Sequence, residues 1–291
     1  MIAIYSKTLD NRSAGVIRRL LGILMQAGID VSLHKPLWDF LYSNGKDAVN
    51  RVSTFHGHDD LLPETQYLIS VGGDGTFLNS INIIRDSGIP VLGINTGRLG
   101  FLANISDDDL QESVEKLLTG ELPVEERTLI HATINGQPVD DFPYALNDAV
   151  IQKSAIGMIT VHSWSDNEFL NTYWADGLIV STPTGSSAYS LSVGGPIVAP
   201  ESQNFIISPI AAHNLNVRPL VIPDHVTLKL KAECRGKDRR FTLSLDSRSV
   251  EYISGAEIEL RRAGFKVKIV KSASFYSTLR NKLMWGVDKR N

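Results

Sequence analysis

The sequence contains a single cysteine, Cys234, so no disulfide can form within the chain. It also lacks a long apolar run. The stretch from residue 16 to 29 is interrupted by Arg18 and Arg19, and no other run approaches the length that crosses a membrane. Residues 1–5 have the pattern of a strand and not that of a secretory leader. We therefore expect a cytoplasmic protein.

The chain has no excess of charge of either sign. It carries 29 basic and 32 acidic residues, a net charge of -3, and 43% of its 291 residues are hydrophobic. This balance gives no support to a nucleic acid or an anionic membrane as the main partner. The length is sufficient for two domains with a large core.

The first part of the chain alternates short apolar runs with helical patterns. We expect strands at residues 2–5, 31–33, 67–71 and 91–94, and helices at residues 11–27 and 77–86. Strands that alternate with helices imply a parallel sheet with right-handed crossovers. In such sheets, ligands bind where loops leave the carboxyl ends of the strands.

After about residue 125 the pattern changes to alternation of apolar and polar residues, at residues 226–231, 241–245 and 265–269. This pattern is typical of half-buried antiparallel strands. The tail from Ser272 to Asn291 loses the alternation but keeps many apolar side chains, and we expect it to pack on a domain or on a neighbouring subunit. The predicted domains are residues 1–125 (α/β), residues 126–270 (β-rich) and a tail of residues 271–291 that packs on the first domain.

Five residues between an apolar strand and a predicted helix, Gly72-Gly73-Asp74-Gly75-Thr76, carry the strongest chemical signal. Glycines at such a turn let the backbone approach a ligand, and the helix N-terminus attracts anions such as phosphate. Asp74 would repel phosphate, so it suggests chemistry: it could accept a proton from a hydroxyl or help to hold a metal ion. The alternative is a plain turn in which Asp74 or Thr76 caps the helix.

Two other nucleotide-binding motifs are excluded. No Gly-Lys-Ser/Thr string of a Walker loop occurs, and the dinucleotide fingerprint lacks its third glycine because Leu78 stands there. A second loop, residues 95–100, follows the strand at residues 91–94 and leaves the same edge of the sheet, so the two loops could line one crevice. Within that loop, two interpretations of Arg98 remain: it contacts phosphate, or it is a surface residue without a ligand.

A long segment of small and hydroxyl-bearing residues, 176–196, has a strand-like core at residues 178–180. Its composition also fits a flexible linker. However, residues 187–193 hold too many apolar side chains for a solvated tether, and hydroxyls beside one aromatic ring suit a base and a ribose. The group His56 to Asp60 could bind a metal, but we expect it to be a solvated loop, since no further ligand group follows at a typical spacing. The other histidines support no catalytic triad.

Taken together, four blocks make the sequence similar to the NAD kinases. They are Gly72 to Thr76, Asn95 to Leu102, Asn147-Asp148, and Asp176 to Pro196. The first block is shared with lipid kinases and phosphofructokinases, whereas the four in this order are specific. The resemblance implies a Rossmann-like α/β domain with a parallel sheet and a mostly antiparallel, sandwich-like C-terminal domain. It also implies transfer of a phosphoryl group from ATP to the 2′-hydroxyl of the adenosine ribose of NAD.

The resemblance also assigns roles to residues. Asp74 falls on the catalytic aspartate, and the glycine loop, Gly72, Gly73, Gly75 and Thr76, would hold phosphates. The implied NAD contacts are Asp74, Gly75, Asn147, Asp148, Asp176, Ser187, Ala188, Tyr189, Ser190, Leu191 and Ser192. Two departures occur: Ser187 stands where the family often has threonine, and Asp246-Ser247-Arg248 stands where relatives often show Asp-Gly-Gln. The second departure leaves a ligand role for Arg248 open.

The implied cofactor is Mg²⁺ with ATP, with no protein group assigned to the metal. The implied partners are NAD and ATP, without nucleic acid or membrane, in a homo-oligomer that is a dimer or a tetramer. Two alternative functions remain. A lipid kinase would share the glycine loop, and a non-enzymatic dinucleotide sensor would keep the regions of Asn147 and Ser187 without needing Asp74.

Overall fold

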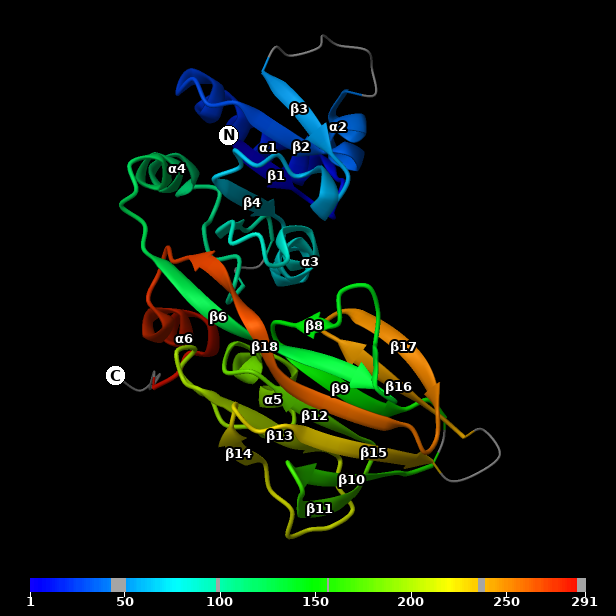
Figure 1. The fold of residues 1–291 in the computed structure, drawn as a ribbon. Helices are drawn as coiled ribbons and strands as arrows, with labels where there is room; N and C mark the ends of the chain where they lie inside the picture. Colours follow the sequence, from blue (N-terminus) through cyan, green and yellow to red (C-terminus); the bar gives the residue numbers. More distant parts are fainter. Residues whose placement is uncertain (43–50, 98–99, 156, 235–238, 287–291) are drawn as a thin grey trace. The chain divides into compact units, whose positions relative to one another are not determined.

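The computed structural model describes residues 1–42, 51–97, 100–155, 157–234 and 239–286 (Figure 1). The chain divides into two compact units, one formed by residues 1–126 with the residues from 267 onward, and the other by residues 127–266. Two long strands, β6 (Val124–Ile134) and β18 (Glu257–Val270), run from one unit into the other. Each unit has its own hydrophobic core.

A parallel sheet forms the centre of the first unit. Its strands lie in the order β3 (Val52–Phe55), β2 (Val31–His34), β1 (Ile2–Tyr5), β4 (Tyr67–Val71) and β5 (Val91–Ile94). Each neighbouring pair is parallel, and Val71 lies beside Ile94 at the carboxyl ends of β4 and β5. Ile269 of β18 extends the sheet by pairing with Val91. The predicted parallel sheet is confirmed.

Helices of the first unit are α1 (Asn11–Gln26), α2 (Lys35–Tyr42), α3 (Asp74–Ile84), α4 (Leu110–Leu118) and α6 (Phe275–Leu283), with a short 3-10 helix η1 (His58–Asp60). Helix α1 forms where the sequence predicted it. The Asp10 side chain caps it by accepting the N–H of Ser13 at 2.7 Å, and its apolar side chains Leu20 and Leu24 are buried. The chain leaves the helix at Gly28, whose φ of +71° favours glycine.

The second unit contains two antiparallel sheets. One has the order β11 (Glu168–Ala175), β10 (Ile159–Ser165), β15 (Leu228–Cys234) and β18, with β6 on β18 and the short strands β7 (Gln137–Pro138) and β8 (Tyr144–Ala145) on β6. The other has the order β14 (Leu220–Pro223), β13 (Asn204–Ile210), β12 (Gly177–Ser181), β9 (Asp148–Lys153), β16 (Arg240–Leu245) and β17 (Arg248–Ile253).

The two sheets enclose one core. Val161 and Leu230 from the first sheet are buried in the same cluster as Ile151, Leu178 and Phe241 from the second. Alternation in β15 explains this, because Leu228 and Leu230 are buried whereas Lys229 between them is exposed. The predicted β-rich, sandwich-like second part is confirmed.

Helix α6 lies in the C-terminal tail. Its first turn is capped by Ser274, whose hydroxyl accepts the N–H of Ser277 at 3.1 Å, and Leu279 is buried. Tyr276 and Trp285 remain more than half exposed, at 60% and 56%. No helix in the described residues is long and apolar enough to cross a membrane.

Candidate functional site

The glycine loop joins the carboxyl end of β4 to α3. The N–H of Gly72 donates to the carbonyl of Ile94 at 2.9 Å, which ties the loop to the end of β5. Gly72 has a φ of +153°, and a Cβ there would lie 2.4 Å from the Oγ1 atom of Thr76. Only glycine fits this position, because Thr76 packs against it.

Helix α3 begins at Asp74, three residues before the predicted start at Phe77. Gly73 is the N-cap and makes no side-chain cap bond, so the alternative in which Asp74 or Thr76 caps the helix is wrong. The first N–H groups of a helix have no partner within it and carry a partial positive charge. Among the described residues, no atom lies within 4 Å of a Cβ placed on Gly73 or Gly75. The loop therefore offers N–H groups to an anion without side chains in the way.

The carboxylate of Asp74 binds the loop that follows β5. Its Oδ2 atom accepts the N–H of Phe101 at 2.8 Å, and its Oδ1 atom accepts those of Leu102 at 3.0 Å and Ala103 at 2.9 Å. The two predicted loops therefore meet at Asp74. Arg98, weighed above as a phosphate contact, lies outside the described residues.

A cation from the C-terminal helix lies near this carboxylate. Burial lowers the pKa of Lys282 on α6, and the charge of Asp74 opposes this by favouring the ammonium form. The Ser272 hydroxyl, just before α6, donates to Asn104, which directly follows the residues bonded to Asp74. The start of the tail is thus attached to the Asp74 loop.

A second group of predicted residues gathers at one end of a sheet in the other unit. There β9 begins with Asp148, β12 ends with Ser181 opposite it, and β16 ends with Leu245 opposite Ala149. Since these strands are antiparallel, the start of β9 meets the ends of its two neighbours. Residues distant in the sequence are brought together in this way.

The residues after β12 pack on the segment before β9. The N–H of Thr182 donates to the carbonyl of Asn147 at 2.9 Å, and its hydroxyl donates to that of Leu146 at 2.6 Å. Gly185 approaches so closely that a Cβ on it would lie 2.1 Å from the Asn147 carbonyl oxygen. The linker interpretation of the segment from 176 is therefore wrong, because its first part is fixed strand and turn.

The hydroxyl-rich stretch forms a 3-10 helix η2 (Thr184–Ser187) and a short helix α5 (Tyr189–Ser192). Tyr189 is 39% exposed, whereas Ser190 is buried and its hydroxyl bonds that of Ser208 at 3.0 Å. The other predicted contacts in this stretch, Ser187, Ala188, Leu191 and Ser192, are exposed or half-buried. Asp176 precedes β12 and pairs with Lys153 at 2.5 Å.

Two carboxyl groups lie next to the start of β9. The pKa of Asp148 is raised from 3.8 to about 7. Burial is the larger cause, and the charge of Asp246 is the smaller one. The carboxyl group of Asp246 is also buried, although the residue as a whole is half-buried, and it accepts the N–H groups of Leu146, Asn147 and Asp148. Such a pair carries less than its full charge near neutral pH.

The two histidines of the loop from His56 to Asp60 each have a partner within the chain. His56 Nδ1 lies 3.1 Å from Asp60 Oδ2, while His58 Nδ1 lies 3.0 Å from the carbonyl of Ile83. The described residues contain no group of three or more histidine, cysteine, aspartate or glutamate side chains that could hold a metal ion.

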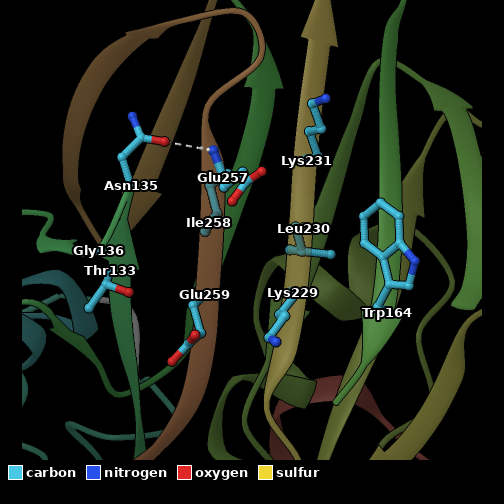
Figure 2. A pocket seen from close by; sticks show the side chains of 10 residues that line it. All are labelled: Thr133, Asn135, Gly136, Trp164, Lys229, Leu230, Lys231, Glu257, Ile258 and Glu259. Atoms are coloured by element: carbon cyan, nitrogen blue, oxygen red, sulfur yellow. Dashed lines mark hydrogen bonds between the residues drawn. The ribbon is translucent and has the colours of Figure 1, made fainter. Parts of the chain in front are cut away.

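A pocket with a volume of about 370 Å³ lies over β15 and β18 (Figure 2). Trp164, Lys229 and Glu259 line it, and the N–H of Glu257 donates to Asn135 at its rim at 2.9 Å. The residues assigned above to NAD do not line this pocket, so we assign it no role in binding NAD.

Three residues at these sites had no assigned role from the sequence: Thr182, Asp246 and Lys282. Asp246 was noted only as part of a departure from the family pattern, although an acidic residue at the end of an alternating strand is a signal for a turn. Lys282 lay in a tail recognised only for its apolar residues.

Comparisons with known proteins match both parts of the chain. The family model of the ATP-NAD kinase N-terminal domain matches residues 3–122, and that of the C-terminal domain matches residues 146–272. An NAD kinase of Flavobacterium psychrophilum is 41% identical, with 100% of this chain and 99% of the relative covered. An NAD kinase of Cytophaga hutchinsonii is 40% identical, with both chains covered completely.

Two crystal structures have the same fold. A yeast NADH kinase in complex with NADH superposes with a TM-score of 0.89 at 22% identity, covering 99% of this chain and 88% of that one. An NAD kinase from Archaeoglobus fulgidus in complex with ATP superposes with a TM-score of 0.77 at 24% identity, covering 97% and 98%. With relatives of 40% identity over its whole length and both domain models matched in order, the chain belongs to the NAD kinase family.

Proposed function

We propose that this member of the NAD kinase family transfers the γ-phosphoryl group of ATP to the 2′-hydroxyl of the adenosine ribose of NAD, with Asp74 as the proton acceptor. The observation that carries the assignment of Asp74 is its position. It lies in the first turn of α3, beside the open glycines, and it is held there by three N–H groups. Phosphoryl transfer depends mainly on alignment and charge stabilisation, and a fixed carboxylate at a phosphate-binding turn suits both.

The hydrogen bonds of Asp74 indicate which oxygen receives the proton. An ionised carboxylate has about four lone-pair sites, two on each oxygen. The Oδ1 atom accepts two N–H groups, from Leu102 and Ala103, whereas Oδ2 accepts one, from Phe101. The Oδ2 atom therefore keeps a site for the ribose hydroxyl. The two N–H bonds to Oδ1 would hold the carboxylate in place and so fix the direction of the open lone pair on Oδ2.

The phosphates of ATP would bind the glycine loop formed by Gly72, Gly73, Gly75 and Thr76. The N–H groups at the start of α3 favour anions, and the open space at Gly73 and Gly75 permits close approach. Mg²⁺ fits as an ion carried by ATP at this loop, since it commonly keeps several waters and binds substrate phosphates. Bound there, Mg²⁺ would neutralise charge on the transferred group.

NAD would be held by the second group of residues. Asn147 and Asp148 at the start of β9 offer amide and carboxyl groups to the dinucleotide, and Asp176 with residues 187–192 offers further polar groups and the exposed ring of Tyr189. The side chains of Asn147 and Asp148 make no hydrogen bond within the described part of the chain, which leaves them available to a ligand.

Further proposals concern the protein as a whole. We propose a cytoplasmic homo-oligomer, a dimer or a tetramer, with NAD and ATP as its partners and neither nucleic acid nor membrane among them. We also keep the predicted division into residues 1–125, 126–270 and 271–291.

One assay tests the proposal. Purified protein is incubated with ATP and Mg²⁺ and with either NAD or diacylglycerol, and NADP formation and lipid phosphorylation are measured. We expect NADP and no phosphorylated lipid. Lipid phosphorylation would favour a lipid kinase, and binding of NAD without either product would favour a dinucleotide sensor.

A further inference from the structure

Asp246 makes an unusual set of hydrogen bonds to the segment that precedes β9. Its Oδ2 atom accepts the N–H of Leu146 at 2.8 Å, and its Oδ1 atom accepts those of Asn147 at 2.7 Å and Asp148 at 3.2 Å. Its own N–H donates to the carbonyl of Asp148 at 3.0 Å. One buried carboxylate therefore holds three consecutive peptide groups.

The same segment is held from its opposite side by Thr182. The donors of the segment point to Asp246, whereas the carbonyls of Leu146 and Asn147 accept hydrogen bonds from Thr182. Gly185 closes the space against Asn147, because a Cβ at Gly185 would overlap the Asn147 carbonyl. The backbone here has little freedom, so it sets the directions of the side chains of Asn147 and Asp148.

Arg248 binds residues 140–144, which precede the segment held by Asp246. Its Nη1 atom donates to the Asp140 carboxylate at 2.8 Å and to the carbonyl of Phe142 at 2.6 Å, and its Nη2 atom donates to the carbonyl of Tyr144. These bonds give Arg248 a structural role. Its charge also acts on Asp246, where it opposes the effect of burial, which raises the pKa of that carboxyl.

We propose that Asp246 is a positioning residue for NAD: its carboxylate fixes the backbone of residues 146–148 and thereby directs the side chains of Asn147 and Asp148. The proposal rests on the proposed function, because Asn147 and Asp148 are the proposed NAD contacts. Asp246 bonds the backbone of this segment. Its effect on NAD passes through the two residues that it holds.

The charge of Asp246 affects the pKa of Asp148, and this effect can be measured. A purely structural role of Asp246 would not produce it. Asp246 is the charged group that raises the pKa of Asp148, to about 7, in addition to burial. An ionised carboxylate accepts hydrogen bonds from the hydroxyl and amide donors of a dinucleotide. NAD should therefore bind the wild type more tightly as the pH rises through about 7, and removal of the Asp246 charge should move this midpoint to lower pH.

The test uses the full-length chain and the variants Asp246→Asn and Asp246→Ser. Asparagine removes the charge and places N–H groups against the N–H of Leu146, whereas serine leaves room for a water molecule. Binding of NAD is measured by calorimetry without ATP across the pH range, and KM values for NAD and ATP are measured in the kinase assay. We expect a Kd for NAD raised by about tenfold or more, a midpoint at lower pH, and an unchanged KM for ATP.

The matched control is Asp166→Asn. Asp166 lies in the exposed turn between β10 and β11, where its carboxylate accepts the N–H of Thr227 at 3.0 Å, so it makes the same kind of bond away from the proposed NAD residues. This variant should bind NAD as the wild type does. Because calorimetry needs no turnover, a wild type that binds NAD without making NADP would contradict the proposed function while the test of Asp246 still applies.

Three results would overturn the proposal. One is an Asp246 variant with the Kd and the pH midpoint of the wild type. Another is an equal rise in both KM values. The third is failure of both Asp246 variants to fold while Asp166→Asn folds, since Asp246 would then serve the fold rather than NAD.

Discussion

Gly100 lies directly against Asp74: a Cβ on Gly100 would fall 1.8 Å from the Oδ1 atom of Asp74. The next three residues donate their N–H groups to the same carboxylate. The loop after β5 and the first turn of α3 therefore fit together only when residue 100 has no side chain. The close contact at residue 100 therefore fixes the position of the Asp74 carboxylate. A substitution that adds one methyl group at residue 100 tests this.

Gly100→Ala should displace the Asp74 carboxylate and lower kcat by about tenfold or more, because small misplacements of a reacting group cost large factors in rate. The expected loss of stability is about 1–3 kcal/mol, as for other overpacked sites. Steady-state kinetics and thermal unfolding measure the two effects. Gly57→Ala is the control, since no described atom lies within 4 Å of a Cβ at Gly57. Wild-type kcat in Gly100→Ala would show that the contact is not needed for turnover.

Asp74→Asn tests the proposed proton acceptor. The amide oxygen of asparagine can still accept N–H groups, but the side chain no longer accepts a proton. Turnover should fall by roughly 10²- to 10⁴-fold, the usual contribution of general acid–base catalysis, while NAD still binds. Single-turnover kinetics and calorimetry with NAD separate the two effects. Near-normal turnover would refute the assignment of Asp74.

The stability of the chain should depend on Asp148. Its pKa rises from 3.8 to about 7 on folding. Between about pH 4 and about pH 7 the folded chain keeps a proton that the unfolded chain has lost, so this residue makes stability fall as the pH rises through that window. The loss is complete above about pH 7, and each pKa unit corresponds to about 1.4 kcal/mol.

Asp148→Asn removes this titration. The melting temperature of the variant relative to the wild type should therefore be higher at about pH 8 than at about pH 5, by an amount equivalent to a few kcal/mol. Differential scanning calorimetry at both pH values measures it, with Asp166→Asn in its exposed turn as the control. A difference that is independent of pH would contradict the coupling of Asp148 to folding.

The sequence predicted the parts of the site that depend on local pattern. Glycines after an apolar strand mark the turn at Gly72, and strands β1, β4 and β5 have the predicted limits. The start of α3 was placed three residues late, because Gly73 and Gly75 are poor helix formers and hide the first turn. Helix α2 was missed, although Pro36 near its start is a helix-start signal.

Other parts of the site have no local signal. The partners of Asp74 lie 27 to 29 residues away, and those of Asp246 lie 98 to 100 residues away. In both cases the partners are backbone N–H groups, which every residue except proline carries. Neither residue type nor spacing can therefore predict these bonds. They follow from which strands are neighbours in the sheets.

Lys282 offers a test of the tail. It lies on α6 near Asp74. Burial lowers the pKa of its ammonium group, and the charge of the Asp74 carboxylate opposes this shift. A cation beside the proposed phosphate site should stabilise the charge of ATP and of the transferred group. Lys282→Gln should therefore raise KM for ATP or lower kcat by about tenfold or more, with little change in NAD binding. Arg280→Gln, on the exposed side of the same helix, is the matched control. If both variants keep wild-type kinetics with ATP, the tail contributes no charge to the reaction.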